Sequence, residues 1–226
     1  MYRERRSRVP GAVVWTTVAD DAQSRVLPDG CMDLLWMRDE LVVAGPDTRA
    51  QLTRLGAGER VTGLRLAPGT APTLLGVPAD ALRDERVALD ALWRPADVAR
   101  LTDEVATSAH PGLALEALAG RAFVRVGGPH AGTAAVVAMV RDGRSVADIA
   151  AACGVGERRL HREAQASFGY GLRTLGRVLR LQRAVTLVHR GLALADVAAA
   201  AGYADQPHLS REVRALADVS PSQLRA

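Results

Sequence analysis

Apolar residues occur in short runs over the first seventy residues of the chain. These runs, rich in β-branched and aromatic residues, predict strands over 12–19, 31–37, 40–45 and 60–69. Only Arg38 and Asp39 separate the second run from the third, so we expect those two strands to form a hairpin. Ala, Leu and Val then take helical spacing over 94–106 and 112–124. The first half is therefore predicted to be a β-rich, barrel-like or sandwich-like module closed by helices.

The strand pattern does not recur after residue 132. Successive segments carry apolar residues at i, i+3 and i+4 and end at or near Gly, which predicts six or seven helices. The longest runs from Leu172 to about His189. The Gly-rich segment 126–132 marks the break. We predict an α+β fold of two domains, with a β-rich domain over 1–126, a linker over 127–132 and an all-α domain over 133–226.

Positive charge is concentrated in the helical half. Residues 1–132 have 16 Arg and 17 acidic residues, a net charge of −1, whereas residues 133–226 have 13 Arg and 8 acidic residues, a net charge of +5. Every basic residue is arginine, whose planar guanidinium suits phosphates and guanine edges. Genome composition is an equally good reason for the absence of lysine. The difference in net charge between the two halves favours nucleic acid as a partner of the helical half.

A segment of the helical half occurs twice. With a shift of 48 residues, Ala147, Asp148 and Gly154 align with Ala195, Asp196 and Gly202, as do three intervening alanines. One inserted residue then brings a second group into register, in which Leu160, Arg162 and Glu163 align with Leu209, Arg211 and Glu212. These identities favour a duplicated structural unit.

Each copy has the features of a helix-turn-helix. A short Ala-rich helix permits close crossing of a second helix, and Gly154 or Gly202 supplies positive φ at the turn. Leu160 and Leu209 are expected to face the first helix of their copy, which leaves their neighbours pointing outward. These neighbours have side chains able to hydrogen-bond base edges, and they are Arg158, His161, Arg162, Gln206, Ser210 and Arg211.

The spacing of the copies suits one face of DNA. A helix of 18 residues spans roughly 27 Å. With the width of the helices added, the two outward helices are expected about one DNA turn, roughly 34 Å, apart. One chain would then contact successive major-groove segments without dimerising. Because the two sets of side chains differ, we expect an asymmetric site.

The helical half resembles the C-terminal domain of AraC/XylS-type transcription regulators. Gly202, Tyr203 and Asp205 match the second motif of that family, followed by His208, Leu209, Arg211, Val213 and Arg214, and later by Ser220, Pro221 and Arg225. Asp218 stands where the family usually has Gly, Leu224 where it has Tyr, and Pro207 where it has Ser. The resemblance implies sequence-specific binding of double-stranded DNA by the six outward residues, with RNA polymerase as a possible partner. It also suggests phosphate contacts from Arg173, Arg177 and Arg180 of the linker helix, with solvated side chains as the equal alternative.

In the first half, residues 27–36, 45–49 and 64–82 resemble the sensor-like domain of a poorly characterised group of these regulators. Such domains respond to small molecules or mediate dimerisation, so the chain is predicted to be a monomer or a homodimer. Trp15, Trp36 and Trp93 all lie in this half, where they are weak candidates for lining an effector pocket, although core packing is the more common role. His110 and His130 have no nearby His or Cys partner, so we expect no metal site and no cofactor.

Two other functions compete with regulation. Cys31 would be the acceptor in a DNA-repair enzyme that takes up alkyl groups, although we expect both Cys31 and Cys153 to be buried as small apolar side chains. Alternatively, the chain sequesters a ligand and its helical domain no longer binds DNA. No apolar run approaches the roughly 20 residues of a membrane span, and the polar N-terminus does not resemble a signal peptide. The expectation is a cytoplasmic regulator that is not an enzyme.

Overall fold

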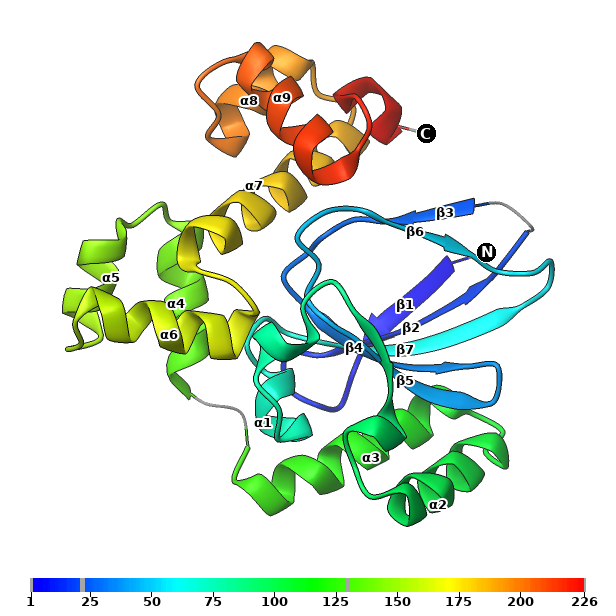
Figure 1. Ribbon diagram of the computed structural model, residues 1–226. Helices are drawn as coiled ribbons and strands as arrows, with labels where there is room; N and C mark the ends of the chain where they lie inside the picture. Colours follow the sequence, from blue (N-terminus) through cyan, green and yellow to red (C-terminus); the bar gives the residue numbers. More distant parts are fainter. Residues whose placement is uncertain (1, 21–22, 129–130, 226) are drawn as a thin grey trace.

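The computed structural model describes residues 2–20, 23–128 and 131–225, which form a β-rich part and a helical part (Figure 1). In the β-rich part, a six-stranded sheet lies between a two-stranded sheet and helices α1, α2 and α3. In the helical part, the long helix α7 runs between two groups of shorter helices. This is the α+β architecture that the sequence predicts.

The larger sheet has the strand order β1-β2-β7-β4-β5-β8, and all neighbouring strands are antiparallel. Its strands are β1 (Tyr2–Arg6), β2 (Val13–Val18), β4 (Met32–Met37), β5 (Glu40–Ala44), β7 (Arg60–Leu66) and β8 (Arg86–Ala88). Strands β4 and β5 form the predicted hairpin. Arg38 and Asp39 turn the chain between them with φ of 51° and 57°, the positive values that a two-residue hairpin turn requires.

The two-stranded sheet pairs β3 (Gln23–Val26) with β6 (Gln51–Arg54) and covers one face of the larger sheet (Figure 1). Leu55, directly after β6, is buried there together with Leu35, Ala44 and Val61. On the same face the Trp15 ring occupies the space that a side chain at Gly63 would need. The glycine in β7 therefore permits the close approach of the indole.

Helices α1 (Ala71–Leu75), α2 (Pro95–Ala106) and α3 (Pro111–Val126) cover the opposite face, with short 3-10 turns η1 (Ala79–Leu82) and η2 (Leu89–Ala91). The largest core of the β-rich part lies on this side, where Leu34, Leu64 and Leu115 are at most 2% exposed. Burial on both faces makes the sheet sandwich-like, as predicted.

All five residues of strand β1 are exposed, and the strand, besides pairing with β2, makes polar contacts with α3. The Glu116 carboxylate accepts hydrogen bonds from Arg5 Nη1 at 3.0 Å, from Arg5 Nη2 at 2.8 Å and from the backbone N–H of Arg8 at 2.7 Å. Its side chain is only 3% exposed. These bonds lower the pKa of Glu116 to about 2, Arg5 being the largest cause.

The helical part is organised around α7, which contributes to two separate cores. Its helices are α4 (Ala131–Arg141), α5 (Val146–Ala152), α6 (Glu157–Phe168), α7 (Leu172–His189), α8 (Leu194–Ala201) and α9 (Gln206–Ala217), followed by the 3-10 turn η3 (Pro221–Arg225). Leu172, Leu175 and Val178 of α7 pack with α4, α5 and α6. Leu181, Ala184 and Val188 pack with α8 and α9. The single helix thus joins two small globular units.

The predicted domain boundary falls close to a break between helices. Helix α3 ends at Val126, Gly127 and Gly128 have positive φ, and α4 begins at Ala131, two residues before the predicted start of the second domain. Pro129 and His130 of the predicted linker lie outside the described residues. Among the helices that are described, none is long and apolar enough to cross a membrane.

The expectation that both cysteines are buried is wrong for Cys153. This residue ends α5 and is exposed, because the last turn of that short helix faces solvent. Cys31 is half-buried.

Candidate DNA interface

The first helix-turn-helix unit consists of α5, a short turn and α6. Ser145 begins α5 with a capping box, in which its hydroxyl accepts from the Asp148 backbone N–H at 3.1 Å. Gly154 has a φ of +67°, so it supplies the left-handed residue that the turn needs. Leu160 of α6 is buried against α5, as its position in the sequence predicts.

The second unit repeats this arrangement with α8 and α9. Gly202 ends α8 with a φ of +82°, and the buried Tyr203 follows it. The Asp205 carboxylate caps α9 by accepting from the His208 backbone N–H at 2.6 Å. Pro207 lies in the first turn of α9, where its missing N–H costs little. Both turns therefore have the conformation that the duplicated sequence predicts.

The six predicted DNA-contacting residues lie on α6 and α9, the second helices of the two units. Within the described part of the chain, none of their side chains takes part in a hydrogen bond or ion pair. Five are exposed and Ser210 is half-buried, the exposed ones being Arg158, His161, Arg162, Gln206 and Arg211. Their polar groups are therefore available to an external partner.

An open groove of about 660 Å³ lies between α6 and the start of α7. Arg158, His161 and Arg162 line one side, and Arg173 lines the other together with the first turn of α7. Gly171 begins α7 and has no side chain to cap the helix. Free N–H groups at a helix N-terminus beside cationic side chains suit a phosphate.

The linker helix α7 has 18 residues, as predicted, which corresponds to about 27 Å. Of the three arginines expected to approach phosphates, only Arg173 is exposed. Arg177 instead donates to both carboxylate oxygens of Glu212, at 2.8 and 3.1 Å. Arg180 donates to the Gly202 carbonyl oxygen at 3.2 Å and stacks over the Tyr203 ring. These two arginines bind the second unit, so the phosphate role predicted for them is not supported.

Comparison with protein-family models matches residues 149–226 to a helix-turn-helix domain, and residues 12–88 to a domain of unknown function (DUF6597). The C-terminal part of the chain is therefore a helix-turn-helix domain. None of the curated proteins matches the chain in sequence.

Among solved structures, the chain is similar to an apo form of a ToxT variant from Vibrio cholerae. The identity is 15% and the TM-score 0.50, over 96% of this chain and 98% of that chain. Wild-type ToxT with a bound unsaturated fatty acid has 15% identity and a TM-score of 0.49, over 94% and 93%. The C-terminal domain of AraT from Geobacillus stearothermophilus has 22% identity and a TM-score of 0.36, over 40% of this chain and 83% of that one. The first likeness shows a ToxT-like two-domain fold.

The β-rich domain contacts both units of the helix-turn-helix domain. Arg83 Nη1 donates to the Gly169 carbonyl oxygen, just after α6, at 3.3 Å. The backbone N–H of Ala50 donates to the Leu216 carbonyl oxygen of α9 at 2.7 Å. Arg25 donates to the neighbouring Ala217 carbonyl oxygen at 3.1 Å. The sequence motifs gave no indication of these contacts, because they join segments far apart in the chain.

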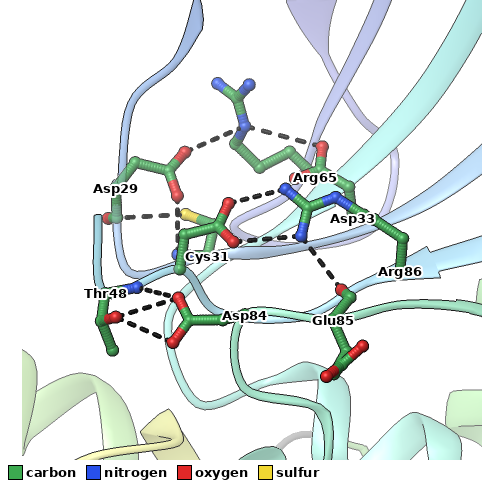
Figure 2. Close-up of polar contacts among 9 residues, drawn as sticks. Asp29, Cys31, Asp33, Thr48, Arg65, Asp84, Glu85 and Arg86 are labelled. Carbon is green, nitrogen blue, oxygen red and sulfur yellow. Dashed lines mark hydrogen bonds and ion pairs between the residues drawn. The ribbon is translucent and has the colours of Figure 1, made fainter. Parts of the chain in front are cut away.

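A group of acidic residues and arginines lies in the β-rich domain (Figure 2). Arg65 pairs with Asp29 at 3.2 Å and with Asp33 at 3.7 Å. Arg86 pairs with Asp47 at 2.7 Å. Burial raises the pKa of Asp33 to about 6, and the nearby Arg65 offsets part of that effect.

Cys31 lies within this group, and its surroundings disfavour the thiolate. Burial raises the pKa of the thiol well above its usual value, and the nearby Asp29 and Asp33 raise it further. A nucleophilic cysteine needs a lowered pKa. The alternative in which Cys31 accepts alkyl groups is therefore not favoured by its environment.

The three tryptophans, the weak candidates for an effector pocket, are not brought together. Trp15 lies on the sheet face covered by β3 and β6, where its indole N–H donates to Asp33 Oδ1 at 2.5 Å. Trp36 and Trp93 pack against the core on the helix side. The Trp93 indole N–H donates to the Leu75 carbonyl oxygen at 3.0 Å. One ligand between the three side chains would have to cross the sheet.

Proposed function

We propose that this chain is a sequence-specific DNA-binding transcription regulator that contacts two successive major-groove segments with α6 and α9. The proposal depends on one observation above all. The six side chains at the predicted contact positions lie on the second helices of two like units, and they have no partner within the described residues. Helix α7 has 18 residues, or about 27 Å, and with the width of the recognition helices added this separation approaches one DNA turn of roughly 34 Å.

The side chains differ in what they recognise. Arg158, Arg162 and Arg211 suit guanine, whose O6 and N7 accept a bidentate guanidinium, and Gln206 suits adenine. Arg173 and the first turn of α7 would hold a phosphate and set the position of α6 along the duplex. Because α6 presents Arg and His whereas α9 presents Gln, Ser and Arg, the preferred site would be asymmetric.

We infer that the β-rich domain regulates DNA binding, in response to a small molecule. Its contacts with Gly169, Leu216 and Ala217 support this role, since a change in the β-rich domain would move the ends of both α6 and α9. Trp15 is joined to the group of acidic residues and arginines through its bond to Asp33. RNA polymerase and a second copy of the chain are further proposed partners in the cytoplasm.

The test is selection of duplexes from a random DNA library by the full chain, followed by fluorescence anisotropy at several salt concentrations. The proposal expects an asymmetric enriched sequence of about two helical turns, whose affinity falls steeply as salt rises. Enrichment of no sequence would contradict it and favour a ligand-sequestering protein instead. Mapping of bound sites across the genome would then identify the neighbouring genes, and with them the class of effector.

A further inference from the structure

The two recognition helices are attached to α7 in different ways. The duplicated sequence places Glu163 and Glu212 at equivalent positions of α6 and α9. Glu163 pairs with Arg159 of its own helix at 2.6 Å, and both side chains are largely exposed. Glu212 instead receives two hydrogen bonds from Arg177 of α7. The same residue type thus stabilises a single helix in one unit and joins two helices in the other.

A second polar contact reinforces this junction. Arg180, one turn after Arg177 on α7, donates to the Gly202 carbonyl oxygen and lies over the Tyr203 ring, with 5.4 Å between its guanidinium carbon and the ring centroid. The Tyr203 ring in turn meets His208 of α9 edge-on. We call Arg177, Arg180, Tyr203 and Glu212 the clamp. It connects α7 to both the turn and the recognition helix of the second unit.

Of the four clamp residues, only Tyr203 belongs to the apolar core of the second unit, and the two arginines and Glu212 lie outside it. That core contacts α7 through Leu181, Ala184 and Val188, which follow the clamp arginines in the sequence. Apolar contacts are not directional and tolerate small rotations of α9 about α7. A bidentate guanidinium–carboxylate pair fixes an orientation, because both hydrogen bonds must remain aligned.

We propose that Glu212, held by Arg177, is a positioning residue that sets the angle of α9 and hence the spacing of DNA segments that the chain accepts. The inference rests on the proposed function and specifies one of its determinants. Glu212 is not offered as a base contact. Because α9 is held at one angle, the chain should prefer one separation between the two DNA segments.

The experiment uses the full chain and the duplex selected by the wild-type protein. Affinity is measured by anisotropy for that duplex, for one with a base pair inserted between the segments, and for one in which the α9 segment is scrambled. Glu212→Gln removes the ion pair and keeps the side-chain shape. Glu163→Gln is the matched control, because it removes the same charge from the equivalent position of the other recognition helix.

We expect Glu212→Gln to bind the selected duplex about 3- to 10-fold more weakly, which lies in the lower part of the range of couplings between contacting residues. It should bind the scrambled duplex as the wild type does, and discriminate less against the inserted base pair. Glu163→Gln should retain the wild-type discrimination. Arg177→Gln should resemble Glu212→Gln, and the double variant should lose little more than either single variant.

Unchanged discrimination in Glu212→Gln, with normal binding and normal thermal unfolding, would overturn the clamp's role and leave the proposed function intact. Equal loss of discrimination in Glu163→Gln would also overturn it, since charge rather than the junction with α7 would then be the cause. Failure of the wild-type chain to enrich any duplex would contradict the proposed function itself, and the clamp's role in DNA recognition with it.

Discussion

The side-chain amide of Gln182 donates a hydrogen bond of 2.7 Å to the carbonyl oxygen of Pro28. It joins the middle of α7 to the loop between β3 and β4. Close by, Gly30 of that loop packs against Leu175, and Leu27 packs against the core of the second unit. The linker helix therefore serves as the common support of the two helix-turn-helix units and of the β-rich domain.

Replacing Gln182 by alanine should weaken this junction by about 1 kcal/mol, because a half-buried hydrogen bond is lost and the Pro28 carbonyl keeps no equivalent donor. The check is hydrogen exchange of the 27–31 loop amides, which should become faster. Arg183→Ala is the control, since this neighbouring side chain is exposed and should change exchange little. Equal exchange in Gln182→Ala and the wild type would show that the bond contributes nothing.

Glu116→Gln should lower the free energy of unfolding at pH 7 by about 1–3 kcal/mol. The smaller figure allows for screening of Arg5, whose side chain is 45% exposed. Because the pKa of Glu116 is lowered from 4.5 to about 2, its contribution is complete above pH 4.5 and is lost as the pH falls toward 2. Urea unfolding from pH 7 to pH 2 should thus show the wild type and the variant converging in acid.

Glu104→Gln provides the comparison for that experiment. Glu104 pairs with Arg121 of α3 at 2.8 Å, but both side chains are about half exposed, so removal of this pair should change stability by less than about 0.5 kcal/mol. A pH-independent difference for Glu116→Gln would contradict the role assigned to its carboxylate.

Sequence patterns predicted the helical half well and the β-rich half only in part. The Gly residues, the Asp205 cap and the Leu160 and Leu209 positions are local signals, so both units follow from them. The strands β3 and β6 carry mostly polar residues, and the contact between β1 and α3 is made by Glu116, which lies 111 residues away from Arg5. The sequence pattern also did not predict the pairing of Arg177 with Glu212. An arginine on a linker helix can contact either a phosphate or an acidic side chain, and only the structure shows which acidic residue is in reach.

Asp218→Gly should raise the free energy of unfolding by about 0.5–1 kcal/mol. Asp218 ends α9 with a φ of 56°, a left-handed conformation that strains every residue with a side chain more than glycine. Its ion pair with Arg25, 3.4 Å long with the Asp218 side chain 80% exposed, offsets little of that strain. Asp218→Ala should have the opposite sign, because it loses the carboxylate and keeps the strain. If the urea midpoints of Asp218→Gly and Asp218→Ala both move in the same direction from the wild-type midpoint, the strain at Asp218 is not the cause.

Cys31 should resist alkylation by iodoacetamide at pH 8, whereas Cys153 should react readily. The raised pKa of Cys31 leaves little thiolate at that pH, and the thiolate is the reactive form. Cys153 is exposed at the end of α5. Mass spectrometry of peptides after timed labelling gives the rates for both cysteines. Labelling in urea, where the chain is unfolded, checks that each thiol can react with iodoacetamide. Rapid modification of Cys31 in the folded chain would contradict this prediction and support the alternative in which Cys31 accepts alkyl groups.

Arg162→Ala and Arg211→Ala should each weaken binding to the selected duplex by about 1–3 kcal/mol, because each removes a side chain placed to contact a base edge. The two variants should lose sequence preference in different segments of the DNA. Arg162→Ala should relax sequence preference in the segment bound by α6, and Arg211→Ala in the segment bound by α9.

Arg100→Ala is the control for these variants, since it removes one positive charge from α2 in the β-rich domain. Repeated library selection with each variant gives the preferences, and anisotropy gives the affinities. A uniform loss of affinity with unchanged preference in both segments would mean that these arginines contact phosphates, because phosphate contacts carry no base information. Loss of preference in the same segment for both variants would contradict the assignment of one segment to each helix.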